Sequence, residues 1–328
     1  MPSTTSAVPF SRVAILGTGL IGGSFGLALR KHSPDISIVG FDRAETLQAA
    51  RARGAVQEAA HDLAAAVRGA DLVYVALPIG ATIKALPAIA AAAAAGALVT
   101  DTGSTKAVIC RGAKTAFAGS ARFLGGHPMA GKETSGIARA DAGLFSGARY
   151  ALIGSADDPD PRAQGFAALV RALGAEPLWC DAETHDWAVG IVSHLPQLLA
   201  VALARVMQEE TDETGLPVSL AGPGLQDMLR LAGSPYGLWR DVAHTNTENV
   251  ARALDRLEQA VEHLRTRLTS KELEQEFLVA NELYKQLKKA EQAARRSGLL
   301  TSIDPWRNID GALKCAATNS EVKSNTPS

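Results

Sequence analysis

The sequence predicts an α/β fold, with a doubly wound parallel sheet in the first half of the chain and an all-helical domain in the second. Two observations lead to this prediction. Up to Cys180, short apolar runs alternate with helical stretches, and most runs are continuously apolar, as in parallel strands covered on both faces. From there to about Arg296 the sequence is helix-like, interrupted by glycine–proline segments at 215–217, 222–224 and 233–237.

Each expected element follows from this alternation. Strands are expected at 12–16, 37–41, 72–77, 97–101, 122–126, 150–154 and 176–180. The helices between them are expected at 20–31, 44–53, 79–95, 105–118 and 159–173. Further on, residues 248–290 combine helical apolar spacing with many charges, which is typical of long helices that pack on each other or on a second subunit.

The length of 328 residues favours two domains, because a single core seldom grows beyond about 250–300 residues. We place the first domain at 1–180, with a flexible lead at 1–11, and the helical domain at 181–298. Residues 299–328 form a tail whose small, polar end is expected to be disordered.

Composition narrows the possible partners. Lys plus Arg (33) nearly equals Asp plus Glu (34), which argues against a broad surface for nucleic acid or anionic lipid. Cys110, Cys180 and Cys315 lack the spacing of a metal site or a disulfide framework and favour a reducing compartment. The N-terminus lacks a signal-peptide pattern, and polar residues and Pro196 interrupt the apolar run 187–207. We therefore expect a soluble cytoplasmic protein without a membrane, nucleic-acid or metal partner.

The segment VAILGTGLIGGSFGLAL (13–29) is typical of a dinucleotide-binding turn. Gly17, Gly19 and Gly22 form a G-x-G-x-x-G pattern between an expected strand and an expected helix. The first glycine permits a tight turn, the second lets the backbone approach a pyrophosphate, and the third lets helix and strand pack closely. Asp42 ends the second strand twenty residues after Gly22, where a carboxylate can bind the ribose hydroxyls. The alternative is a glycine turn that holds no ligand.

The acidic residue also bears on which cofactor binds. Asp42 favours NAD, because its charge would repel the 2′-phosphate of NADP. The adjacent Arg43 could bind that phosphate, so NADP stays open as the alternative. The expected cofactor-binding residues are Gly17, Gly19, Leu20, Ile21, Gly22, Asp42, Arg43, Leu77 and Ser104.

Two further strands end in polar or turn-forming segments, VALP (75–78) and TDTGSTK (100–106). Ligands of open α/β sheets lie beyond the carboxyl ends of the strands, so Thr102, Ser104 and Lys106 are expected near the nicotinamide. Ser104 could instead cap the helix that follows it.

The segment GGHPMAGKETSG (125–136) carries the candidate general base. It is too rich in glycine to predict a helix or a strand, and it places His127 just after the strand at 122–126, at the edge of the sheet where the cofactor is expected. An imidazole titrates near neutral pH and can accept a proton from a substrate hydroxyl. The alternative is an incidental histidine in a surface loop.

Five segments, GTGLIGGSFGLAL, VTDTGSTK, GGHPMAG, HDWAVGIVSHLPQ and LRLAGSPYGLWRD, together resemble the prephenate/arogenate dehydrogenases of tyrosine biosynthesis over about residues 12 to 290. The resemblance implies an NAD(P)-dependent dehydrogenase that acts on CH–CH donors with decarboxylation, converting prephenate to 4-hydroxyphenylpyruvate or arogenate to tyrosine. It also implies a Rossmann-type first domain, a helical dimerisation domain and hence a homodimer.

The resemblance assigns roles to single residues. His127 is the catalytic base, and Ser104 contacts this histidine and the substrate hydroxyl. Arg230 binds a substrate carboxylate, for which a guanidinium offers two parallel hydrogen bonds and lysine does not; the alternative is a surface salt bridge. The residues matched to orientation and gating at the mouth of the site are Glu133, Asp186, Asp227 and Trp239.

The segment HDWAVGIVSHLPQ adds two expected substrate contacts, Ser193 and Gln197, four residues apart on one face of a helix that Pro196 is expected to kink. Many family members have a second histidine where this chain has Gln197, which leaves the preference between prephenate and arogenate open. His185 and His194 are interpreted as buried structural histidines.

Two other interpretations share parts of this pattern. A β-hydroxyacid dehydrogenase or pyrroline-carboxylate reductase would have the same architecture, but the former uses a lysine on the first long helix of the second domain, and 187–205 contain none. A nucleotide-sensing dimer without chemistry would need no combination of His127, Ser104 and Arg230. An enzyme is therefore favoured.

Overall fold

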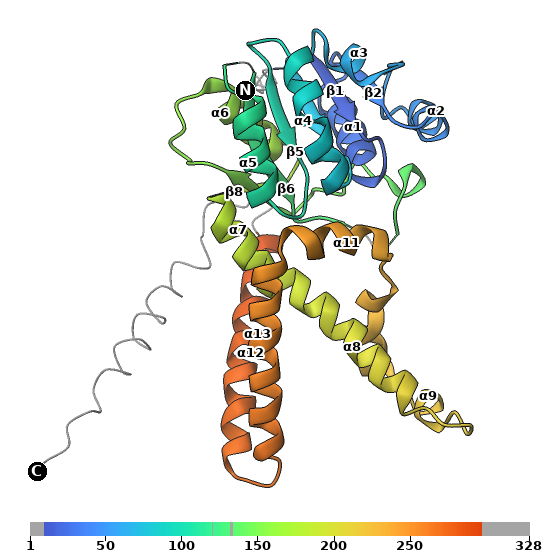
Figure 1. The fold of residues 1–328 in the computed structure, drawn as a ribbon, viewed down its shortest axis with the longest axis vertical. Helices are drawn as coiled ribbons and strands as arrows, with labels where there is room; N and C mark the ends of the chain where they lie inside the picture. The colour runs from blue at the N-terminus through green and yellow to red at the C-terminus, as the bar shows by residue number, and fades with distance from the viewer. Residues whose placement is uncertain (1–9, 120, 132–133, 297–328) are drawn as a thin grey trace, which may run out of the picture. The chain divides into compact units, whose positions relative to one another are not determined.

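The computed structural model describes residues 10–119, 121–131 and 134–296, and for 290–296 the backbone alone. The chain divides into two compact units, Met1–Ala260 and Val261–Ser328. The described part of the first unit holds an eight-stranded sheet of order β3-β2-β1-β4-β5-β6-β7-β8 (Figure 1). The strands are β1 (Arg12–Leu16), β2 (Ser37–Phe41), β3 (Glu58–Ala59), β4 (Leu72–Val75), β5 (Leu98–Asp101), β6 (Arg122–Pro128), β7 (Arg149–Ile153) and β8 (Glu176–Cys180).

Helices cover both faces of this sheet, as expected for strands without a polar face. The helices are α1 (Leu20–His32), α2 (Ala44–Ala52), α3 (Leu63–Val67), α4 (Ile79–Ala92), α5 (Ala107–Ala116) and α6 (Pro161–Ala172). One apolar core joins Phe25 of α1 and Phe166 of α6 to one face of the sheet. The other core joins Leu86 of α4 and Ala113 of α5 to the opposite face. The predicted doubly wound architecture is confirmed, and the short β3 and α3 are additions that the sequence did not reveal.

The direction of two strands differs from the expected parallel sheet. The strands β1 to β6 run parallel, but β7 pairs antiparallel with β6, with His127 opposite Ala151, and β8 then runs parallel to β7. A parallel connection needs a crossover, usually a helix. Within the described residues between β6 and β7 there is only a short 3-10 turn (Ile137–Arg139), so the chain returns beside the strand it has just left.

The chain beyond β8 is helical, as predicted. Its helices are α7 (Ala182–Val189), α8 (Leu195–Glu209), α9 (Leu216–Ser219), α10 (Pro223–Leu229), α11 (Tyr236–Thr245), α12 (Thr247–Thr266) and α13 (Glu272–Arg296). A π-helical turn (Gly190–His194) joins α7 to α8, and a 3-10 turn (Arg230–Gly233) follows α10.

Of the described helices, the run Ala182–Glu209 is long and apolar enough by composition to span a membrane. Several of its polar side chains, including His185, His194 and Gln197, are buried against the rest of the first unit. The core helix of a globular domain meets the same length and composition test. In this run, 28% of the most apolar window is buried within the chain.

The described part of the second unit is the end of α12, a short turn and α13. His263 and Glu276 pair across this turn at 2.7 Å, and Arg267 pairs with Glu272 at 2.9 Å. Large apolar side chains of the unit are nevertheless exposed, namely Val261, Leu264, Leu268, Phe277, Leu278, Val279, Leu283, Tyr284 and Leu287. Exposed large apolar side chains in this number are typical of a subunit interface.

Candidate active site

The cofactor end of the site is the turn between β1 and α1. Gly17 has a φ of +92°, and a Cβ there would lie 2.4 Å from the carbonyl oxygen of Ala76. A Cβ on Gly22 would lie 1.9 Å from the carbonyl oxygen of Gly17, so both positions require glycine. At Gly19 a Cβ would meet nothing within 4 Å, and α1 begins there without a side-chain cap. An open, uncapped helix start is what a dinucleotide pyrophosphate requires.

Asp42 follows β2 and ties its strand end to this turn. One carboxylate oxygen accepts hydrogen bonds from the Thr18 N–H at 2.7 Å and the Thr18 hydroxyl at 3.2 Å, and the other accepts from the Arg43 N–H at 2.7 Å. A carboxylate has about four acceptor positions, so one is left for a ribose hydroxyl. Arg43 itself is exposed at the start of α2. The residues present therefore fit a dinucleotide.

The expected cofactor residues gather at one edge of the sheet. They lie after the carboxyl ends of four strands: Gly17, Gly19, Leu20, Ile21 and Gly22 after β1, Asp42 and Arg43 after β2, Leu77 after β4, and Ser104 after β5. The order of the strands reverses between β1 and β4, so this edge holds the switch point of the sheet.

Lys106 was expected near the nicotinamide; in the structure it is fully buried, and its ammonium pairs with Asp101, the last residue of β5. Its ammonium also donates a hydrogen bond to the Gly126 carbonyl oxygen at 2.7 Å. Asp101 accepts two further hydrogen bonds, from the Gly103 N–H at 2.8 Å and the Gly126 N–H at 3.2 Å. This buried pair fixes the backbone directly before His127.

His127 belongs to strand β6 and not to the glycine-rich loop that the sequence predicts, because the strand continues to Pro128 by pairing with β7. Its side chain is buried, and its Nδ1 lies 2.9 Å from Nε2 of His185. Burial, followed by the nearby His185 and the Lys106 ammonium, holds the pKa of His127 well below its ordinary value of 6.5. The imidazole is therefore neutral at neutral pH and can accept a proton.

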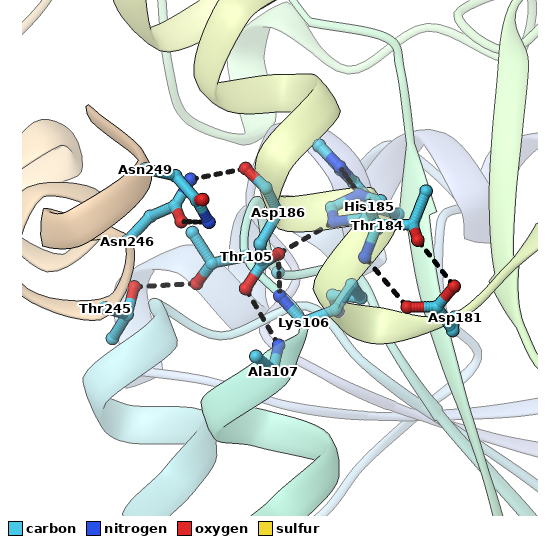
Figure 2. Close-up of polar contacts among 12 residues, drawn as sticks. Thr105, Lys106, Ala107, Asp181, Thr184, His185, Asp186, Thr245, Asn246 and Asn249 are labelled. Carbon is cyan, nitrogen blue, oxygen red and sulfur yellow. Dashed lines mark hydrogen bonds and ion pairs between the residues drawn. The ribbon is translucent and has the colours of Figure 1, made fainter. Parts of the chain in front are cut away.

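The start of α5 is capped from another helix. Both carboxylate oxygens of Asp186 in α7 accept backbone hydrogen bonds there, from the Lys106 N–H at 2.6 Å and the Ala107 N–H at 2.9 Å (Figure 2). Ser104 was the alternative cap for this helix, but α5 begins at Ala107, too far along the chain for it. Ser104 is half-buried and hydrogen bonds to no other described residue, so its contact with His127 stays a prediction.

His185 is buried, as interpreted from the sequence, and it also lies against the candidate base. Its Nε2 contacts His127, and its Nδ1 lies 2.8 Å from the carboxylate of Asp186. His194 fits the structural interpretation, since its Nδ1 lies 3.1 Å from the side-chain amide of Asn246. Burial lowers the pKa of His194 to about 4, so its ring is also neutral near pH 7.

The segment that carries Ser193 and Gln197 is a π-helical turn followed by α8, where a kinked α-helix was expected. Pro196 has no N–H and its ring crowds the preceding turn, which the wider π turn accommodates. Gln197 is buried, and its amide donates a hydrogen bond to the Leu231 carbonyl oxygen at 2.9 Å. Gln197 thus fixes the turn that begins at Arg230, and Ser193 is half-buried one helical turn before it.

The remaining expected site residues lie around this helical segment. Arg230 begins the 3-10 turn after α10 and is exposed, as is Asp227 in α10. Trp239 of α11 stacks edge-on to His194 at a ring distance of 5.8 Å, and its buried indole N–H has no partner among the described residues. Glu133 lies outside the described residues.

Comparison with known families covers both halves of the chain. The family model for the nucleotide-binding domain of prephenate dehydrogenase matches residues 25–177, and the model for its dimerization domain matches 181–289. The prephenate dehydrogenase of Lactococcus lactis is 35% identical over 255 residues, which cover 77% of this chain and 69% of that protein. This chain belongs to the prephenate dehydrogenase family. Another relative, the cyclohexadienyl dehydrogenase of Zymomonas mobilis, is 28% identical over 80% of this chain and 90% of that protein.

Solved structures of a prephenate dehydrogenase and an arogenate dehydrogenase agree with the fold. The structure of the Aquifex aeolicus enzyme in complex with hydroxyphenyl propionate and NAD+ matches with a TM-score of 0.77 at 27% identity, covering 85% of this chain and 99% of that one. The Synechocystis arogenate dehydrogenase structure matches with a TM-score of 0.66 at 28% identity, covering 87% and 98%.

Two features of this family member's site escaped the sequence reasoning. The pairing of Asp101 with Lys106 had one available signal, a carboxylate at the end of an apolar strand five residues before a lysine. The contact of His185 with His127 had a weaker one, the adjacent His–Asp pair at the start of an otherwise apolar helix. The second signal does not specify a partner 58 residues away in the chain.

Proposed function

We propose that this chain is an NAD-dependent prephenate dehydrogenase of tyrosine biosynthesis, which oxidatively decarboxylates prephenate to 4-hydroxyphenylpyruvate. Membership of the family supports this proposal, and the observation that carries it is the state of His127. This imidazole is buried, neutral and hydrogen bonded through Nδ1, and it lies at the sheet edge that holds the glycine turn. A neutral imidazole so placed can accept the proton of a ring hydroxyl.

The glycine turn and Asp42 support NAD as the cofactor. The uncapped start of α1 at Gly19 would hold the pyrophosphate, and the acceptor position left on Asp42 would hold a ribose hydroxyl. The negative charge of Asp42 disfavours a 2′-phosphate, while the exposed Arg43 supports NADP as the alternative. When bound, the nicotinamide supplies the hydride acceptor of the oxidation.

The side chains then have two tasks. His127 takes the proton of the ring hydroxyl during oxidation and returns it to the same oxygen when loss of CO2 makes the ring aromatic, so no net proton is consumed. Arg230 binds a carboxylate of the substrate, with Ser193 as a further contact and Gln197 holding the Arg230 turn through the Leu231 carbonyl. Ser104, at the same sheet edge, is proposed to contact the hydroxyl.

A second candidate is arogenate or dual-specificity cyclohexadienyl dehydrogenase activity. The residue that supports this second candidate is Gln197, whose side chain is neutral and whose amide donates a hydrogen bond to the Leu231 carbonyl oxygen. Because this side chain adds no positive charge to the pocket, it does not disfavour the ammonium group that distinguishes arogenate from prephenate.

We also propose that the protein acts as a cytoplasmic homodimer. The match to a dimerization domain supports this, and so does the row of exposed apolar side chains in the second unit, which includes Phe277, Leu283 and Leu287. The balanced charge of the chain supports the expectation of no nucleic-acid partner.

One assay tests the activity. Prephenate or arogenate is added to the purified protein with NAD+ or NADP+, and the absorbance of the reduced cofactor is followed. We expect turnover with prephenate and NAD+, and a fall in kcat of about 10²- to 10⁴-fold in His127→Asn with cofactor affinity retained. Absence of turnover with both substrates would overturn the proposed function, and near-normal turnover of His127→Asn would show that His127 is not the base.

Arg230→Ala tests the substrate contact. A charge-assisted hydrogen bond is worth about 1.5–3 kcal/mol, so KM for prephenate should rise about 10- to 100-fold with little change in kcat. The matched control is Arg205→Ala on α8, an exposed arginine paired with Glu209, for which KM should not change. An unchanged KM in Arg230→Ala would place this arginine outside the site.

A further inference from the structure

A continuous line of hydrogen bonds leads from the candidate base to the start of helix α5. Nδ1 of His127 lies 2.9 Å from Nε2 of His185, and Nδ1 of His185 lies 2.8 Å from Oδ1 of Asp186. Figure 2 shows His185 and Asp186 side by side on α7, with the carboxylate directed at the backbone of Lys106 and Ala107. Each of the three side chains in the line, from His127 to Asp186, is at least nine-tenths buried.

The direction of each hydrogen bond follows from the carboxylate. An ionised carboxylate only accepts, and Asp186 already accepts from the N–H groups of Lys106 and Ala107 at the positive end of a helix. The proton of its contact with His185 must therefore sit on Nδ1 of His185. In a neutral ring Nε2 is then an acceptor, so the proton between the two histidines must come from Nδ1 of His127.

We infer that His185 and Asp186 are positioning residues that hold His127 as the tautomer with its proton on Nδ1 and its lone pair on Nε2. This inference rests on the proposed function only in naming Nε2 as the atom that takes the substrate proton. The backbone of α7 is fixed as well, since the Asp186 carbonyl oxygen accepts a hydrogen bond from Asn246 at 2.7 Å. The line is thus anchored from both α5 and the start of α12.

The proton balance of this arrangement is simple. One proton moves from the substrate hydroxyl to Nε2 of His127 and later returns, while both Nδ1 protons stay in place. The imidazolium formed keeps donating to His185, whose ring is oriented by the negative charge of Asp186. The other groups close to His127 are the Lys106 ammonium, balanced by Asp101, and the neutral ring of His194.

A competing arrangement carries one proton more. If His185 were a cation, its Nε2 would donate to Nδ1 of His127. The proton of His127 would then sit on its Nε2, which would leave this atom no lone pair to accept a proton from the substrate. Nitrogen-15 NMR of histidine side chains distinguishes the two arrangements in the wild-type protein without cofactor or substrate, at about pH 7.5. The His127 and His185 signals are assigned by their loss in His127→Asn and His185→Gln.

We expect both rings to show a protonated Nδ1 and an unprotonated Nε2. A His127 ring protonated on Nε2, or a His185 ring protonated on both nitrogens, would overturn the inference. This measurement needs no turnover, so it decides the tautomer even if prephenate and arogenate are both inert, which would be the failure of the proposed function.

Kinetics of two variants at the middle position supply a second measurement. In His185→Gln the side-chain NH2 can donate to Asp186 while its oxygen accepts from His127, so the tautomer is kept. One neutral hydrogen bond of about 1 kcal/mol replaces another, so kcat should stay within about 10-fold of the wild-type value. In His185→Leu both contacts are lost, and kcat should fall on the order of 100- to 1,000-fold with KM changed little.

A control separates positioning from a loss of stability in α7. Asp181→Ala removes the carboxylate that caps the same helix by accepting from the Thr184 N–H at 2.8 Å, a change of about 1 kcal/mol in stability. This variant should melt earlier than the wild type yet keep its kcat and its histidine NMR signals. Equal losses of kcat in His185→Gln and His185→Leu would overturn the inference.

Discussion

The buried ion pair beneath the candidate base allows a quantitative test by Lys106→Met. Methionine has nearly the volume of the lysine stem, so the substitution removes the ammonium and leaves little cavity. Asp101 then keeps two hydrogen bonds, from the N–H groups of Gly103 and Gly126, but loses its compensating charge while fully buried. The Gly126 carbonyl oxygen loses its lysine donor at the same time.

Removal of one partner of a buried pair lowers the free energy of unfolding by about 3–5 kcal/mol. The pair lies entirely in the interior, so the full range applies to it. With a urea dependence of about 3 kcal/mol per M, this loss lowers the unfolding midpoint by about 1–1.7 M. The double variant Asp101→Asn/Lys106→Met removes both charges and should recover part of this loss.

Urea unfolding followed by circular dichroism at one fixed protein concentration measures both variants. The matched control is Arg205→Met, because its pair with Glu209 is exposed, with side chains 72% and 54% accessible, and such helix pairs contribute about 0.5 kcal/mol or less. A Lys106→Met midpoint equal to that of the control would refute the reasoning. So would a double variant no more stable than the single one.

Other changes test the glycine turn and the buried histidines. Gly22→Ala should abolish NAD+ binding and lower Tm, because its Cβ would lie 1.9 Å from the Gly17 carbonyl oxygen, whereas Gly19→Ala should keep Tm and weaken NAD+ binding. Calorimetry of both variants measures Tm and NAD+ affinity, and equal Tm values for the two would contradict this expectation. The pKa of His127 is lowered and that of His194 is about 4, so the unfolded chain binds more protons than the folded one below about pH 6.5. The free energy of unfolding should therefore fall as the pH drops from about 6.5 to 5, by up to about 1.4 kcal/mol per histidine per pH unit. A urea unfolding midpoint that stays constant over this pH range would contradict the lowered pKa values of the two histidines.

The sequence predicts well what local geometry dictates. The spacing of Gly17, Gly19 and Gly22 between a strand and a helix already specifies the turn, because the turn's own backbone calls for glycine: Gly17 has a positive φ, and a Cβ on Gly22 would lie against the Gly17 carbonyl oxygen. Continuous apolar runs likewise indicate a sheet covered on both faces, and two apolar cores on opposite sides confirm it.

The sequence does not reveal what depends on partners far apart in the chain. The runs of β7 and β8 look like those of the parallel strands, so their reversed direction appears only in the pairing of His127 with Ala151. The N-terminus of α5 offered a nearby serine as its cap, but the carboxylate of Asp186, 80 residues later, takes that position. Local propensity favours Ser104, and tertiary packing overrides it.

The helix starts at the edge of the sheet also have a consequence for synthesis on the ribosome. Asp186 caps α5, and the carboxylate of Asp241 accepts a hydrogen bond from the Gly80 N–H at 2.9 Å in the first turn of α4. Both helices are therefore translated well before their caps. At about 5–20 residues per second, the residues between 180 and 241 take roughly 3–12 s to add. We expect the nascent nucleotide-binding domain to gain the α5 cap soon after α7 has been made, to keep α4 uncapped through most of this interval, and to reach its full stability only once α11 has been made.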